Sequence, residues 1–126
     1  MKVQKFEDLI AWQKAQDLAV HIYFKFTKLK DYGFRDQICR ATISISNNIA
    51  EGFDRNSNAD FPRFLFIAMS SCSEVKSMLY LAHRLNYIIT DDQKMLLNNA
   101  NEISKIIRGL INSLKKGNKN PSPTLP

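Results

Sequence analysis

The fold is decided by the stretch from Gln37 to Arg55, which reads Gln-Ile-Cys-Arg-Ala-Thr-Ile-Ser-Ile-Ser-Asn-Asn-Ile-Ala-Glu-Gly-Phe-Asp-Arg. Its apolar residues recur every three or four positions, which predicts a helix with one apolar face. The opposite face is rich in serine and asparagine, which are weak helix formers because their side chains compete for backbone hydrogen bonds. We therefore expect neighbouring helices, rather than intrinsic propensity, to hold this helix. The apolar positions are Ile38, Ala41, Ile45 and Ile49, and the polar ones are Ser44, Ser46, Asn47 and Asn48.

Three other segments show the same helical periodicity, and short polar turns separate them. The pattern predicts helices over about residues 7–29, 34–53, 60–86 and 90–116. Gly52 is expected to mark the end of the second helix. The predicted fold is all-α, an antiparallel up-and-down four-helix bundle over residues 1–116. Residues 117–126 are polar and proline-rich, so we expect a disordered C-terminal tail.

The composition is that of one ordinary domain, with 126 residues of which 44% are hydrophobic. No apolar run approaches the ~20 residues of a membrane span, and the N-terminus lacks the apolar core of a signal peptide. We therefore expect a cytoplasmic protein with no membrane partner. The two cysteines, Cys39 and Cys72, fall on apolar helical faces. We interpret them as free buried thiols, because a disulfide is disfavoured in a reducing compartment and a zinc site needs more ligands.

The sequence lacks the motifs in which catalytic, phosphate-binding or metal-binding residues are usually arranged. The sequence has no glycine-rich phosphate loop, no nucleophile elbow and no Glu-x-x-His pair of the kind a di-iron bundle requires. His21 and His83 have no metal-ligand spacing to each other or to the cysteines. We expect no catalytic residue, no cofactor and no metal.

Positive charge is concentrated near the C-terminus. The net charge is +6, and from Gln93 onward there are six basic residues and one acidic residue. Lys105, Arg108, Lys115 and Lys116 advance by helical spacing along one face of the fourth helix. Such a stripe can bind RNA or DNA backbone, although it can also be an ordinary solvated face. No recognition-helix motif is present and no aromatic residue interleaves with the stripe, so binding would be independent of sequence.

Several large apolar residues lie outside the predicted core stripes. A single bundle does not need them there, and apolar residues gathered along a ridge suggest a subunit interface. We therefore predict a homo-oligomer whose interface includes Trp12, Tyr23, Phe24, Phe66, Met69 and Tyr80.

Charged residues also recur on the facing sides of the second and third helices. Antiparallel pairing about a turn near residue 56 places Arg40 opposite Glu74 and Glu51 opposite Arg63. We expect these residues, with Asn48 beside them, to form structural polar pairs that fix the helix register. The alternative is a set of solvated charges, whose pairing is worth ~0–1 kcal/mol.

The sequence also carries a recognisable set of motifs. These are Phe6-x-x-Leu9-x-x-Trp12-Gln13-Lys14-Ala15, Gln37-x-x-Arg40-Ala41, Ser44, Asn48-Ile49-Ala50-Glu51-Gly52, Phe64-Leu65-x-Ile67-Ala68-x-x-Ser71 and Glu74. Together they resemble the small bacterial four-helix-bundle proteins encoded in intervening sequences of large-subunit ribosomal RNA genes. The accessory variability protein of diversity-generating retroelements is similar.

This resemblance implies a ring-shaped homopentamer with a basic surface. In the retroelement relatives, the ring binds a reverse transcriptase and nucleic acid. Two functions are therefore expected as alternatives. One is an oligomer that binds nucleic-acid backbone, and the other is a structural or protein-interaction scaffold, for example a partner of a reverse transcriptase.

Overall fold

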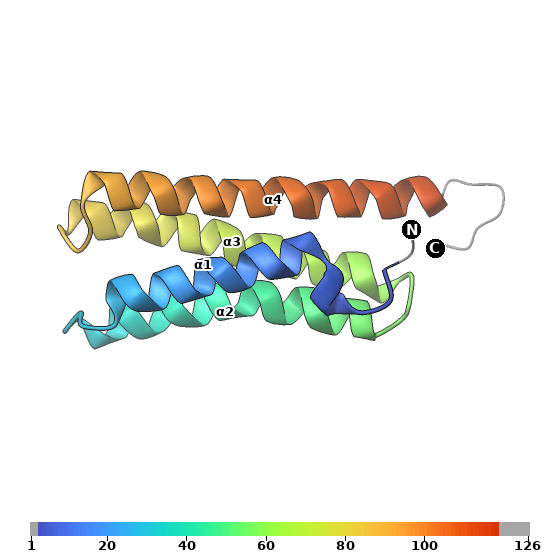
Figure 1. Cartoon of the computed structure of the whole chain (residues 1–126), viewed down its shortest axis with the longest axis horizontal. Helices are drawn as coiled ribbons and strands as arrows, with labels where there is room; N and C mark the ends of the chain where they lie inside the picture. Colours follow the sequence, from blue (N-terminus) through green and yellow to red (C-terminus); the bar gives the residue numbers. More distant parts are fainter. Residues whose placement is uncertain (1–2, 119–126) are drawn as a thin grey trace.

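The computed structural model describes residues 3–118, which form an antiparallel up-and-down bundle of four long helices (Figure 1). A short 3-10 helix, η1 (Phe6–Asp8), precedes the helices α1 (Ile10–Phe26), α2 (Tyr32–Asp54), α3 (Asp60–Arg84) and α4 (Thr90–Asn118). Each long helix packs against its neighbours in sequence, and α4 closes the bundle against α1. The predicted all-α fold is confirmed. Residues 119–126 of the predicted tail lie outside the described residues.

The core is formed by the apolar stripes that the periodicity indicated. The fully buried side chains come from all four helices, and aliphatic residues dominate among them. Burying each such side chain contributes about 1.5–3 kcal/mol, which chain entropy largely offsets. The largest of these side chains are Phe26, Leu18, Ile22, Ile38, Ile45, Ile49, Leu65, Leu79, Leu96, Ile103, Ile107 and Ile111.

The polar side chains of α2 are used for contacts to the neighbouring helices. The Ser71 hydroxyl on α3 donates to the Ser44 hydroxyl at 2.9 Å, and the Asn48 side-chain amide donates to the same hydroxyl at 2.9 Å. On the other side, the Gln16 side-chain amide of α1 donates to the Ser46 hydroxyl at 3.0 Å. These bonds satisfy buried polar groups, so neighbours offset the low helix propensity of this segment.

Gly52 lies inside α2 and does not end it. The helix continues to Asp54, and the left-handed residue that follows is Asn56, with a φ of 51°. A Cβ added at Gly52 would lie 2.6 Å from the Cβ of Phe64 on α3. The glycine is therefore required for close approach of two helices, and the sequence-based prediction of a stop was wrong.

Two helix features differ from simple expectation. α1 begins only at Ile10, because Leu9 adopts an extended conformation with φ of −74° and ψ of 125°. α3 is long and apolar enough, by length and composition, to cross a membrane, with a mean hydropathy of 1.2 over its most apolar window. The core helix of a bundle meets the same criterion, and the apolar stripe of α3 is buried against α2 and α4.

Candidate nucleic-acid interface

The charges of α4 are divided between two sides of the helix. On the side that faces α1, Glu102 forms an ion pair with Lys14 at 3.3 Å, and Asp92 forms one with Lys25 at 2.9 Å. Both pairs are partly exposed, so each contributes little to stability. Each pair also cancels the negative charge of one acidic residue on this side of α4.

The basic residues predicted on α4 lie on the remaining surface of the helix. All of them are exposed, and none forms an ion pair with any residue between 3 and 118. By contrast, the arginines at the turn between α2 and α3 are neutralised, since Arg55 pairs with Glu51 and Arg63 pairs with Asp60, each at 3.1 Å. The α4 basic surface, as we call this set, consists of Lys105, Arg108, Lys115 and Lys116.

An aromatic side chain from α3 lies within this surface. The guanidinium carbon of Arg108 is 5.9 Å from the centroid of the Phe66 ring, and the ammonium nitrogen of Lys115 is 5.7 Å from it. These distances are those of cation–π contacts. The ring itself remains 40% exposed. The sequence-based statement that no aromatic residue interleaves with the stripe was therefore wrong, because the aromatic comes from a different helix.

The predicted interface residues separate into two groups. One group is exposed and consists of Tyr23, Phe24, Phe66 and Tyr80. Phe24 has the largest exposed fraction among the large apolar residues that the structure describes, 75%. Trp12 and Met69 are half-buried and pack against the core, and the Trp12 ring makes an edge contact with Phe6 of η1 at 5.3 Å. The reason for placing Trp12 and Met69 in an interface therefore does not hold.

The predicted polar pairs between α2 and α3 do not form in the region that the structure describes. Glu51 pairs with Arg55 four residues later, and Arg63 pairs with Asp60 three residues earlier, so both partners lie about one helical turn away along the chain. Local partners succeed because they need less ordering of long side chains than a contact between helices. Arg40 and Glu74 line one open groove of about 580 Å³, but the Glu74 carboxylate accepts a 3.4 Å hydrogen bond from Gln37 instead. Asn48 forms no pair with α3 either, since its side-chain amide donates to Ser44 one turn earlier on α2, and it is Ser44 that accepts from Ser71 of α3.

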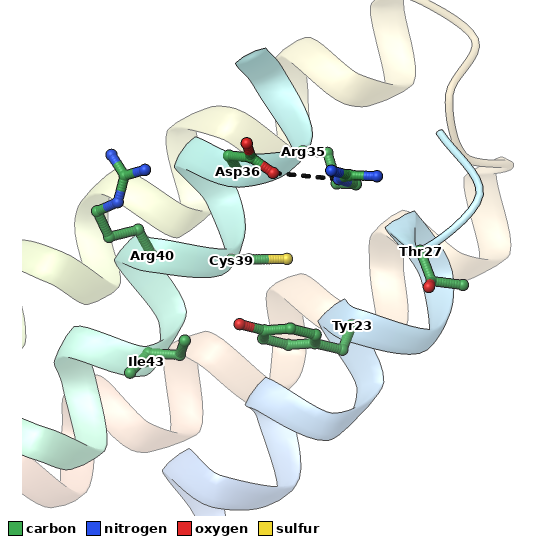
Figure 2. A pocket seen from close by; sticks show the side chains of 7 residues that line it. All are labelled: Tyr23, Thr27, Arg35, Asp36, Cys39, Arg40 and Ile43. Atoms are coloured by element: carbon green, nitrogen blue, oxygen red, sulfur yellow. Dashed lines mark hydrogen bonds and ion pairs between the residues drawn. The ribbon is translucent and has the colours of Figure 1, made fainter. Parts of the chain in front are cut away.

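A second open pocket, of about 420 Å³, lies between α1 and α2 (Figure 2). The thiol of Cys39 points from α2 toward α1, where Tyr23 and Thr27 form the opposite wall, and Arg35 pairs with Asp36 at 3.1 Å on its rim. Burial raises the pKa of the Cys39 thiol, and the nearby Arg35 offsets this only in part. A thiol with a raised pKa carries less thiolate, which is the nucleophilic form, so burial makes Cys39 a weaker nucleophile than a free cysteine.

The described residues contain no cluster of three or more side chains that could hold a metal ion. His21 is exposed on α1, and the His83 ring bonds to the Thr90 hydroxyl at 3.0 Å across the turn between α3 and α4. Cys72 is buried and donates a hydrogen bond to the Ala100 carbonyl at 3.1 Å. His83 and Cys72 therefore have structural hydrogen-bond partners, and His21 lies at the surface of α1.

Comparison with known proteins agrees with this architecture. The family model described as 23S rRNA-intervening sequence protein matches residues 7–109. A solved structure from Bacteroides thetaiotaomicron is similar, with 30% sequence identity and a TM-score of 0.76, and the match covers 81% of this chain and 98% of that one. It is described as a protein of unknown function from the S23 ribosomal protein family. No curated protein matches the chain.

Proposed function

The chain belongs to the family of 23S rRNA-intervening sequence proteins, and we propose that it is a non-enzymatic, homo-oligomeric protein that binds nucleic-acid backbone through the α4 basic surface. The solved relative is itself of unknown function, so the family supplies a fold and no activity. The proposal therefore rests on the surface of this chain.

The observation that carries the proposal is the absence of acidic partners around the α4 basic surface. Within residues 3–118, its four cations are exposed and form no ion pair, while the acids of α4 at 92 and 102 are paired with lysines of α1. Cations left without partners on one face give a positive potential that attracts polyanions. Binding would follow the release of condensed counterions and would not depend on base identity.

Oligomerisation would strengthen this surface. Phe24, 75% exposed, and Tyr80, 57% exposed, are large side chains left uncovered by the bundle, as expected if another subunit covers them. Cyclic symmetry would repeat the α4 basic surface in each subunit, so that weak contacts add along one bound strand. The resemblance makes a pentamer the first assembly to test, by sedimentation at tens of micromolar protein.

The direct test replaces Lys105, Arg108, Lys115 and Lys116 with glutamine and measures the affinity for labelled oligonucleotides of several unrelated sequences. We expect uniform weakening across all sequences, with unchanged circular dichroism and sedimentation. The matched control replaces with glutamine four exposed cations at the opposite end of the bundle. These cations also have no ion pair in the described part of the chain; they are Lys28, Lys30, Arg84 and Lys94. An equal loss in both variants would mean that only net charge matters, and would refute a localised site.

The second candidate is a protein-interaction scaffold, which the exposed rings of Phe24 and Tyr80 favour. In that case the apolar surface would bind a different protein, and the basic residues would only solvate the bundle. Absence of oligonucleotide binding by the parent protein at low salt, where backbone binding is strongest, would decide for the scaffold.

A further inference from the structure

Phe66 is the one aromatic side chain that the described structure places against cations of α4. We propose that the α4 basic surface selects single-stranded nucleic acid, and that Phe66 is the platform on which an unpaired base stacks. This inference rests on the proposed function, because it concerns the class of nucleic acid bound at the same surface.

The α4 basic surface has the composition of a site for single strands. Proteins that bind single strands combine a positive groove along the backbone with aromatic side chains on which bases stack. Here Arg108 and Lys115 approach the Phe66 ring at 5.9 and 5.7 Å, so one base on the ring would place its flanking phosphates near two cations. The Arg108 guanidinium can itself stack on a base, because it is planar and weakly hydrated.

The Phe66 ring is accessible from solvent. Phe66 is 40% exposed although it is a large apolar side chain. Ser70 and Ser73 follow it at helical spacing on α3 and are also exposed, so the next side chains along this face are small. A base can therefore approach the ring over this stretch of α3, and its stacking would exchange with the Arg108 and Lys115 contacts to the ring.

Single strands and duplexes offer different groups to this surface. In a duplex the base faces are stacked on one another, so only the phosphates can reach the cations. An exposed aromatic adds nothing to that contact. An unpaired base can use both the ring and the cations, so the surface should favour single strands at equal length and salt.

The test uses the full-length protein and fluorescence anisotropy with RNA and DNA oligonucleotides of one length, each as single strand and as duplex. We expect tighter binding of the single strands. Phe66→Leu should weaken single-strand binding about fivefold or more, the low end of the stacking contribution, and change duplex binding less than twofold. Phe66→Tyr should keep the preference, because it keeps the ring. Comparing the affinities for RNA and DNA single strands shows whether the sugar contributes to binding at a site formed by an aromatic ring and cations.

Two controls make the outcome specific. Tyr32→Leu removes another exposed ring that has an arginine over it, since Arg35 lies 4.8 Å from its centroid, but this ring is on α2 away from the α4 basic surface, so single-strand binding should not change. Sedimentation of Phe66→Leu should match that of the parent. A changed assembly state would place Phe66 in a subunit contact and would overturn the inference.

The remaining outcomes distinguish the two proposals. If Phe66→Leu binds single strands like the parent while the four-glutamine variant loses binding, the stacking platform is refuted and backbone binding stands. Equal affinity of the parent for duplex and single strand also refutes the platform. If the parent binds no oligonucleotide at low salt, both proposals fail.

Discussion

Replacing Gly52 with alanine should destabilise the bundle, although the same change usually stabilises a helix. In an unobstructed helical position, Gly→Ala gains about 0.5–1 kcal/mol, because alanine loses less backbone entropy on folding. At Gly52 the new Cβ would lie 2.6 Å from the Phe64 Cβ, 3.3 Å from its Cγ and 3.2 Å from a ring carbon of Phe61. The Phe64 Cβ is attached to the α3 backbone and cannot rotate away, so α2 and α3 must separate.

The expected magnitude follows from these two opposing terms. Overpacking costs about 1–3 kcal/mol, and the 2.6 Å contact joins two Cβ atoms held by backbone, so the cost falls in the upper part of that range and exceeds the helix-propensity gain. We therefore expect a net loss of about 1–2 kcal/mol, or a urea midpoint lowered by about 0.5–1 M at a typical dependence near 2 kcal/mol per molar. The assay is equilibrium urea unfolding followed by circular dichroism, at one fixed protein concentration because assembly would otherwise shift the midpoint.

Gly109→Ala is the matched control. Gly109 is also helical and exposed, and an added Cβ there meets no atom within 4 Å. This variant should be more stable than the parent by about 0.5–1 kcal/mol. The reasoning is refuted if Gly52→Ala is as stable as the parent, or if the two variants shift the midpoint in the same direction.

Three further predictions concern individual contacts. The Tyr87 hydroxyl donates to Asp31 at 2.7 Å and, with the Phe34 backbone N–H, holds the pKa of Asp31 below its usual value. The stability that this hydrogen bond contributes is present above the usual pKa and is lost as the pH falls through the lowered pKa. Below about pH 4, the parent should therefore lose more stability than Tyr87→Phe, as measured by the unfolding midpoint during acid titration. Cys39 lines an open pocket whereas Cys72 is fully buried, so mass spectrometry should find Cys39 alkylated first, and faster labelling of Cys72 would contradict the packing. The stability losses on substituting Arg40 and Glu74 should add within about 0.5 kcal/mol in a double-mutant cycle, since no ion pair joins the two residues. A larger coupling would show that the cross-helix pair forms.

The bundle could be predicted from sequence because its signal is local and repeated. Stripes such as Ile38, Ile45 and Ile49 report one buried face per helix, and short turns leave few ways to connect four helices. The role of Gly52 could not be read in the same way. A glycine near the end of a periodic segment looks like a stop signal, and only the position of Phe64 shows that it allows close packing.

The sequence allowed only part of the candidate site to be predicted. The basic residues on α4 share a helical spacing, so the stripe was visible in the sequence. The contact with Phe66 depends on the register between α3 and α4, which local periodicity does not specify. Pairing α3 with α4 about their turn could have placed Phe66 opposite Arg108. The cross-helix charge pairs failed for the converse reason, because Glu51 and Arg63 had closer partners along the chain.

Binding of nucleic-acid backbone by the α4 basic surface should appear in the salt dependence of the dissociation constant. For single strands, the slope of log K against log salt is about 0.7 for each phosphate neutralised. We predict a steep slope for the parent protein. In the variant with glutamine at 105, 108, 115 and 116, the slope should be lower by about 0.7 for each phosphate that is no longer neutralised. The same affinity and the same slope in parent and variant would show that the α4 basic surface is only a solvated face.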